Sequence, residues 1–400
     1  MSAEQIRKRL LNQYQVLRTV HFRGPVGRSV LSRQCKIRKN SITSIVAELI
    51  KREILVEDVP GNLRSQLTLD TKKYHVLTAS IRPQSVLFNR VYLDGRLEQR
   101  DVVEYPANAM PETVLDIIAS HFQKDIRGKE DRVMGLGIAV RGIVDPALGV
   151  GLNAVNLTGW KDVKVGEYFE KRLDRPVHLD NDTRCQVRAH AWFEKLWTEH
   201  STISFLALTE GIGLATICHG EPLLGSDLIA GEIGHLQAGD EGRKCHCGRL
   251  DCLEAYYGLP ALTQTLKKAA PDVKDWSRPA DWAGHFAAHL ALHDALMKAT
   301  KHLARVLSVT WMTLDPDILV IGGSDPKVSE LILNCALPLL KDAGCMQITD
   351  KHLRIGMSED EGQPRGIAAR VIDAVFTTGK FTLAEQPKVS EVKQGTAGSK

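Results

Sequence analysis

The chain has 400 residues, more than one ordinary hydrophobic core accommodates, so its length predicts two or three domains. A hydrophobic content of 43% with 25% charged residues is typical of a soluble globular protein. No apolar run approaches the roughly 18 residues of a membrane-spanning helix, and no hydrophobic region follows the charged N-terminus as in a secretion signal. We therefore expect a cytoplasmic protein with no membrane partner.

The net charge of +4 is unevenly distributed. The first 70 residues contain 13 basic and 6 acidic side chains and carry +7, whereas the other 330 contain 39 and 42 and carry −3. A small basic segment on a nearly neutral body favours nucleic-acid binding, although a merely solvated surface would show part of the same excess.

The N-terminal pattern predicts three short helices and a hairpin. The spacing of Ile6, Leu10 and Leu17 predicts an amphipathic helix over 3–21. A second helix is expected from about residue 28, and a third over 40–55. Two strands about the turn Pro60-Gly61-Asn62 would form a wing. We predict a winged helix-turn-helix DNA-binding domain over 1–72, with double-stranded operator DNA as its partner.

The second helix of such a motif enters the major groove and places its N-terminal residues at base edges. The residues expected on its exposed side, and therefore to contact DNA, are Arg38, Lys39, Asn40, Ser41, Thr43 and Ser44. Arg64, beside the wing turn, is expected to reach a minor groove. The alternative is a three-helix packing or dimerisation module whose polar face is only solvated.

From about residue 73, strands alternate with helices, which is typical of α/β architecture. The candidate strands are 75–81, 85–93, 133–140, 204–209, 214–220 and 318–323, and the candidate helices are 111–126, 184–197, 258–270, 285–313 and 364–377. This order predicts two lobes facing a cleft, over 73–380. Residues 381–400, rich in Lys, Gln, Gly and Ser, are expected to be disordered and dispensable for DNA binding.

Three of the eight cysteines crowd together in CHCGRLDCLE (245–254), ten residues after GEIGH (231–235). In a cytosolic chain this spacing favours metal over oxidised pairing. The two segments resemble the hallmark of the ROK family of repressors and sugar kinases, and the resemblance extends over about residues 5–380. It implies one structural Zn²⁺ per chain, bound by His235, Cys245, Cys247 and Cys252.

The chemistry of these residues supports the metal independently, because three thiolates and one imidazole complete a closed tetrahedral site. Gly248 is expected to supply a tight backbone after Cys247, and His246 to be a spacer. The alternative is a set of ordinary buried cysteines near a histidine.

GLGIAVRGIVD (135–145) and NAVNLTGW (153–160) resemble segments that shape the family's sugar pocket, and LDNDTRC (179–185) resembles the segment with its sugar-contacting Asn and catalytic Asp. The resemblance implies a sugar site made of Asn156, Asn181, Asp182, Glu232, His235 and Glu254. Convergent carboxylates and amides satisfy sugar hydroxyls, which both donate and accept. Taken alone, Asn181-Asp182 could equally be a turn.

The family's kinases hold ATP with a DxGxT loop and a second glycine-rich loop. Here LTASIRPQS (77–85) stands in place of the first loop and contains no glycine, although phosphate cradling needs closely approached backbone N–H groups. The second loop keeps Gly211 and Gly213 but has Glu210, whose carboxylate would repel phosphate. Arg141 and Arg184 are further departures from the kinases and bear on which sugar fits.

We therefore expect a winged helix-turn-helix joined to a two-lobed, actin-like and sugar-kinase-like domain with a structural zinc site. The expected function is transcriptional repression by sequence-specific DNA binding, with a sugar or sugar phosphate as effector and no catalysis. A bacterial homodimer or homotetramer, bound to the nucleoid when on DNA, follows from the resemblance. The alternatives are an ATP-dependent sugar kinase of the same family and a regulator that responds to a protein partner.

Overall fold

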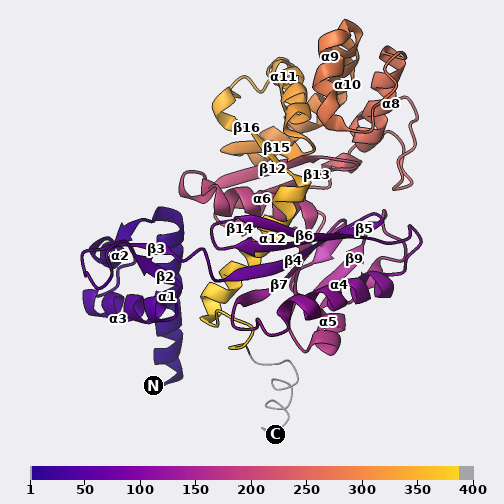
Figure 1. The fold of residues 1–400 in the computed structure, drawn as a ribbon. Helices are drawn as coiled ribbons and strands as arrows, with labels where there is room; N and C mark the ends of the chain where they lie inside the picture. The colour runs from indigo at the N-terminus through magenta and orange to yellow at the C-terminus, as the bar shows by residue number, and fades with distance from the viewer. Residues whose placement is uncertain (1, 387–400) are drawn as a thin grey trace. The chain divides into compact units, whose positions relative to one another are not determined.

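The computed structural model describes residues 2–386 (Figure 1). Contacts divide the chain into two units, Met1–Asp180 with Ile367–Lys400 and Asn181–Gly366. Each unit contains one five-stranded sheet with helices packed against it. Among the described residues, no helix is both long and apolar enough to cross a membrane.

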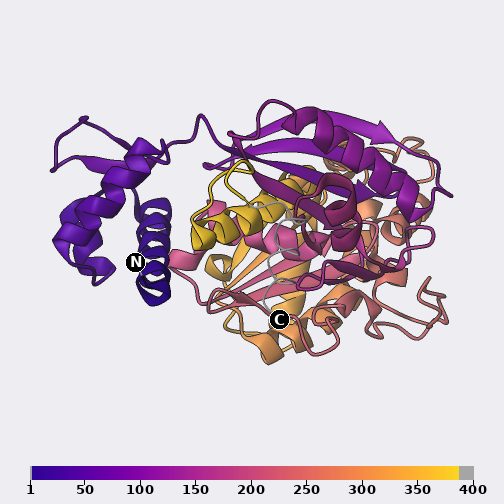
Figure 2. The same cartoon turned by 90° about the horizontal axis from the view of Figure 1, so that it is seen from below.

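The N-terminal part of unit 1, residues 2–72, contains three helices and a small sheet. The helices are α1 (Ala3–Arg23), α2 (Arg28–Gln34) and α3 (Lys39–Lys51), and the strands β1 (Val26–Gly27), β2 (Leu55–Glu57) and β3 (Gln66–Leu69) pair in the order β1-β3-β2. Leu17, Leu31 and Ile42 are fully buried between them. In both views the loop between β2 and β3 lies at the outer edge of this segment (Figures 1 and 2).

The larger sheet of unit 1 has the order β11-β7-β4-β5-β6, formed by β4 (His75–Arg82), β5 (Ser85–Tyr92), β6 (Leu97–Glu104), β7 (Val133–Val140) and β11 (His178–Asn181). Helices α4 (Pro111–Ile126) and α5 (Val165–Leu173) share a core with one face. Helix α12 (Glu359–Thr378) packs on the other, where a Cβ on Gly135 or Gly137 would lie 2.6 or 2.7 Å from Val371 or Ile367. A three-stranded sheet of β8 (Ile143–Asp145), β9 (Val150–Asn153) and β10 (Lys161–Val163) completes the unit.

Unit 2 contains the sheet β14-β13-β12-β15-β16, formed by β12 (Thr202–Leu208), β13 (Ile212–Cys218), β14 (Glu221–Pro222), β15 (Ile318–Gly323) and β16 (Leu353–Ser358). Its helices are α6 (Asp182–Phe193), α7 (Glu254–Tyr257), α8 (Leu259–Ala269), α9 (Trp282–Ala288), α10 (Leu290–Leu314) and α11 (Pro326–Asp342). The single helix expected over 285–313 is wrong, because His289 adopts extended backbone angles and separates α9 from α10.

The prediction of a disordered C-terminal tail is wrong for residues 381–386. Phe381 and Leu383 are 1% and 0% exposed, and the Leu383 N–H donates to the Val133 carbonyl at 2.8 Å. Two apolar side chains fill the core here, although they are too few to form a periodic pattern. Residues 387–400, also assigned to the tail, lie outside the described residues.

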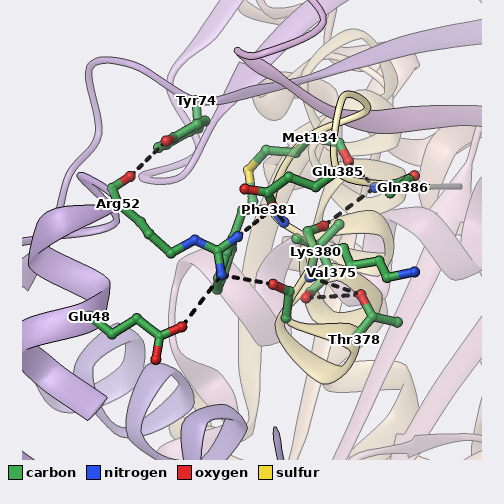
Figure 3. Close-up of polar contacts among 11 residues, drawn as sticks. Glu48, Arg52, Tyr74, Met134, Val375, Thr378, Lys380, Phe381, Glu385 and Gln386 are labelled. Carbon is green, nitrogen blue, oxygen red and sulfur yellow. Dashed lines mark hydrogen bonds and ion pairs between the residues drawn. The ribbon is translucent and has the colours of Figure 1, made fainter. Parts of the chain in front are cut away.

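The same C-terminal segment contacts Arg52, the residue that caps α3 (Figure 3). Arg52 Nη1 donates to the Gly379 carbonyl at 3.1 Å, and its other terminal nitrogen pairs with Glu385. The Tyr74 hydroxyl donates to the Arg52 carbonyl at 2.7 Å. The C-terminal end of α3 is therefore fixed to the rest of unit 1 on both its backbone and its side chain.

Candidate functional site

Four side chains in unit 2 converge as a metal site requires. One ligand atom from each of His235, Cys245, Cys247 and Cys252 lies within 4.8 Å of all the others. Cys245 Sγ is 3.7 Å from His235 Nδ1, and Cys247 Sγ is 3.7 Å from Cys252 Sγ. Because Zn–S bonds of 2.3 Å give a tetrahedron with edges of about 3.8 Å, this spacing fits zinc.

The pKa values in the cluster are shifted in both directions: burial raises the pKa of Cys245 and, to about 12, that of Cys252, whereas those of His235 and Cys247 are lowered. Burial lowers the pKa of His235, so the imidazole is held in the neutral form that a metal binds. Burial raises the pKa of Cys247, but the Arg249 backbone N–H and side chain outweigh it and bring the pKa to about 7. All eight cysteines lie among residues 2–386, and none of them forms a disulfide there.

The backbone around the cysteines is arranged by short polar contacts. Gly248 has φ +88°, a left-handed conformation that confirms the expected need for glycine after Cys247. The Asp251 carboxylate accepts from the Arg243 N–H at 2.9 Å and from the Tyr256 hydroxyl at 2.5 Å. These contacts fix the loop that carries three of the four candidate ligands.

His246, expected from sequence to be only a spacer, has a side-chain contact that the sequence did not indicate. His246 Nδ1 lies 3.0 Å from Glu254 Oε1, while Glu254 Oε2 accepts from the Ile212 N–H at 3.1 Å. The Glu254 side chain is only 9% exposed. Glu254 is therefore held between the cysteine loop and the start of β13.

Acidic side chains expected to bind sugar lie near the metal site. Partial burial raises the pKa of Glu232, the negative charges of Asp182 and Glu254 raise it further, and the Arg184 guanidinium opposes them. Glu232 Oε2 is 4.0 Å from His235 Nε2. The His235 ring therefore has Nδ1 near the Cys245 thiol and Nε2 near the Glu232 carboxylate. Such a cluster can accept hydrogen bonds from several hydroxyl groups of one ligand.

Asn181, which from sequence alone could equally be part of a turn, begins a helix. It is the N-cap of α6, where its side-chain oxygen accepts from the Arg184 N–H at 3.0 Å. Its side-chain nitrogen donates to Asp182 Oδ1 at 2.9 Å, and the Thr183 N–H donates to the same oxygen at 2.8 Å. The cap thus orients the Asp182 carboxylate.

Asn156, the remaining residue expected to bind sugar, lies in unit 1, whereas Asn181, Asp182, Glu232, His235 and Glu254 lie in unit 2. It lines a cavity of about 70 Å³ together with Gln84, Tyr105 and Trp160. Its assignment to the sugar site stays a prediction.

A tight hairpin occupies the segment that the resemblance aligns with the first phosphate loop of the ROK kinases. Arg82 pairs with Ser85 across the two-residue turn Pro83-Gln84 between β4 and β5. The Tyr105 N–H donates to the Gln84 carbonyl at 2.9 Å, and its hydroxyl bonds to the Arg82 carbonyl. These contacts occupy backbone groups of the turn, which contains no glycine with freedom to approach a phosphate.

The side chains expected to contact DNA are all exposed. They follow the turn before α3 or occupy its first two turns, and comprise Arg38, Lys39, Asn40, Ser41, Thr43 and Ser44. The Thr43 hydroxyl donates to the Lys39 carbonyl at 3.1 Å and keeps lone pairs for a further donor. Arg64 is also exposed, in the loop between β2 and β3.

Comparisons with known proteins place this geometry in a family. The family model described as ROK family matches residues 88–351, more than half of the chain. The chain is 25% identical over 382 residues to a putative xylose repressor of Caldicellulosiruptor sp. (strain Rt8B.4), covering 90% of this chain and 95% of that protein. It is 23% identical to the DNA-binding transcriptional repressor Mlc of Escherichia coli (strain K12), covering 91% and 93%.

Solved structures share the fold. A ROK family transcriptional regulator described as a homologue of an E. coli protein superposes with a TM-score of 0.77 at 20% identity, covering 93% of this chain and 98% of its own. A ROK family glucokinase from Streptomyces griseus superposes with a TM-score of 0.59 at 19% identity, covering 73% and 98%. With the family model, the Cys3His cluster and this fold in agreement, the chain belongs to the ROK family.

Proposed function

We propose that the protein is a DNA-binding transcriptional repressor whose ROK domain binds a sugar or sugar phosphate as effector. One observation carries the proposal: α3 exposes basic and hydrogen-bonding side chains at its N-terminal end. The element order α1-β1-α2-α3-β2-β3 supports a winged helix-turn-helix over residues 1–72. The excess charge of the first 70 residues supports the same role.

The coverage of the comparisons favours a repressor over a kinase. The repressors match about nine tenths of this chain, whereas the S. griseus glucokinase covers 73% of it and nearly all of itself. The part of this chain that the repressors cover and the glucokinase does not is about as long as the N-terminal segment, residues 2–72. The hairpin at Pro83-Gln84 further disfavours ATP binding, so we propose that the chain is not an enzyme.

Zinc has a structural role in this proposal. His235, Cys245, Cys247 and Cys252 would hold one ion, and a closed set of four protein ligands leaves no position for catalysis. The ion would fix the loop that orients His246 and Glu254, and thereby the carboxylates that face the effector. A symmetric homodimer or homotetramer would match two half-sites of an operator.

Selection of duplexes from a random-sequence pool by the full-length chain tests the proposal. We expect enrichment of one sequence, and Arg38→Ala or Thr43→Ala should weaken binding to it by about 1 to 3 kcal/mol if the side chain contacts a base. Glu330→Ala, far along the chain in α11, is the control. Failure to enrich any duplex would contradict DNA binding, and sugar-stimulated ATP hydrolysis that Asp182→Ala abolishes would establish the kinase instead.

A further inference from the structure

The loop between β2 and β3, residues 58–65, is here called the wing loop, and its shape is fixed from within. Asp58 Oδ1 accepts from the Val59 N–H at 2.8 Å and from the Gln66 N–H at 2.9 Å. Asn62 Oδ1 accepts from the Arg64 N–H at 2.9 Å. These bonds define the loop but do not connect it to any helix.

Glu57, the last residue of β2, supplies that connection. Its Oε2 accepts from the Gly61 N–H at 2.8 Å, and its Oε1 pairs with Arg28 Nη2. The Glu57 and Arg28 side chains are only 8% and 12% exposed. One carboxylate therefore joins the turn of the wing loop to the first residue of α2.

Packing alone does not hold the turn in place. Gly61 has φ +75°, and no heavy atom lies within 4 Å of the position that a Cβ would take. Chiefly the hydrogen bond from Arg28 lowers the pKa of Glu57, so the carboxylate stays ionised near neutral pH. A charged acceptor holding an N–H in a half-buried setting forms a stronger bond than a neutral one.

Arg28 is the first residue of the helix that packs against α3. β1, which directly precedes Arg28, pairs with β3 on the far side of the wing loop. The Glu57 contacts thus relate the wing loop to the helices whose exposed residues are expected in the major groove.

We propose that Glu57 is a positioning residue for DNA binding: through Arg28 and Gly61 it holds the wing loop, and with it Arg64, in a fixed orientation to α3. A single duplex then meets α3 in its major groove and Arg64 in the adjacent minor groove without a separate ordering step. This inference rests on the proposed function, because it assumes that the N-terminal segment binds duplex DNA.

The test uses the full-length chain and the duplex that the wild type enriches from a random pool, with binding measured by fluorescence anisotropy. Glu57→Gln should weaken binding about 10-fold or more relative to Glu53→Gln. Glu53→Gln is a matched control, because it removes the same charge from an exposed ion pair with Lys73 that lies away from the wing loop. Arg28→Gln removes the same pair from the helix side and should act like Glu57→Gln, which keeps the test valid if one variant folds poorly.

Coupling to Arg64 separates positioning from general destabilisation. Arg64→Ala should weaken binding at least about 5-fold in the wild type but less than about 2-fold in Glu57→Gln, whereas the effect of Arg38→Ala should be alike in both backgrounds. An undiminished Arg64 effect in Glu57→Gln would overturn the proposal.

Hydrogen exchange of the Gly61 amide, followed by NMR, tests the anchor without DNA. Exchange should be about 10-fold faster or more in Glu57→Gln than in the wild type or Glu53→Gln. Unchanged exchange would refute the anchor itself, even if Glu57→Gln weakened DNA binding. A wild-type chain that enriches no duplex but shows the exchange difference would overturn the proposed function and leave the anchor standing.

Discussion

The guanidinium carbon of Arg52 lies 4.3 Å from the centre of the Phe381 ring, so the residue that caps α3 stacks on a side chain 329 positions later in the chain. Phe381 is 1% exposed and lies three residues after the end of α12. The C-terminal segment is thus part of the support of the helix expected to enter the major groove (Figure 3).

Removing this support should destabilise unit 1. Phe381→Ala should lower the free energy of unfolding by about 3 to 5 kcal/mol, because a buried ring leaves a cavity and Arg52 loses its stacking partner. Urea denaturation measures the change, and Lys380→Ala, an exposed neighbour, is the control. Truncation after Lys380 should also weaken operator binding, contrary to the expectation from sequence. A Phe381→Ala chain as stable as Lys380→Ala would contradict this account.

The C-terminal segment shows where inference from sequence ends. Helix α4 is found at its predicted bounds because Pro111 marks its first turn and its apolar residues repeat at helical spacing. Phe381 and Leu383 stand among polar residues and bury themselves against strands and helices hundreds of positions away. No local pattern encodes such a contact, so composition suggested disorder instead.

In the candidate site, too, some features could be predicted from sequence and others could not. The four candidate metal ligands were predictable as a cluster because three lie within eight residues, with a fixed order and spacing. The contacts of His246 with Glu254 and of Glu57 with Gly61 were not, because each depends on the direction in which a side chain leaves its loop. Sequence identified the residue types of the site, and the fold assigned their individual partners.

Removal of the metal should destabilise unit 2. Cys247→Ser should lose the bound zinc, seen by elemental analysis as a fall from one ion per chain, because a hydroxyl replaces a thiolate ligand. A loss of more than about 3 kcal/mol is expected, which would lower Tm by about 6 °C or more. Cys218→Ser is the control, since Cys218 is exposed and outside the cluster. Full zinc occupancy in Cys247→Ser would rule out this ligand.

Stability should fall on mild acidification because of His75. Burial, and then the positive charge of Arg90, lower the pKa of His75 from 6.5 to about 4. As pH falls below 6.5, His75 binds a proton in the unfolded chain but stays neutral in the folded chain until about pH 4. The folded state is therefore fully stable above pH 6.5 and loses stability as pH falls towards 4. The loss amounts to about 3 kcal/mol for a shift of this size.

Urea denaturation of the wild type and of His75→Phe between pH 7 and 3 measures the effect. The difference between the two chains should change across this interval and level off below pH 4. His219→Gln, at an exposed position, should follow the wild type. Parallel curves for the wild type and His75→Phe would show that His75 does not cause the pH dependence.

Asp182 and Asn181 allow effector response to be separated from folding. Asn181→Ala should cost about 1 kcal/mol of stability, because it removes the N-cap of α6. Asp182→Asn keeps the size of the side chain and an acceptor for the Thr183 N–H, but removes a charge expected to face the effector. We expect Asp182→Asn to fold and bind operator like the wild type and to lose its response to sugar.

Operator binding titrated with a panel of sugars and sugar phosphates measures that response. A sugar that favours one conformation over another changes operator affinity by the ratio of its own affinities, and the operator must then weaken sugar binding by the same factor. Coupling of about 1 to 3 kcal/mol would release DNA roughly 5- to 150-fold in the wild type. In Asp182→Asn the factor should approach one, since an amide nitrogen that can only donate replaces the second carboxylate oxygen, which would accept a hydroxyl hydrogen bond. A variant that still releases DNA fully would remove Asp182 from the sensor, and a wild type that no sugar affects would favour a protein partner as the signal.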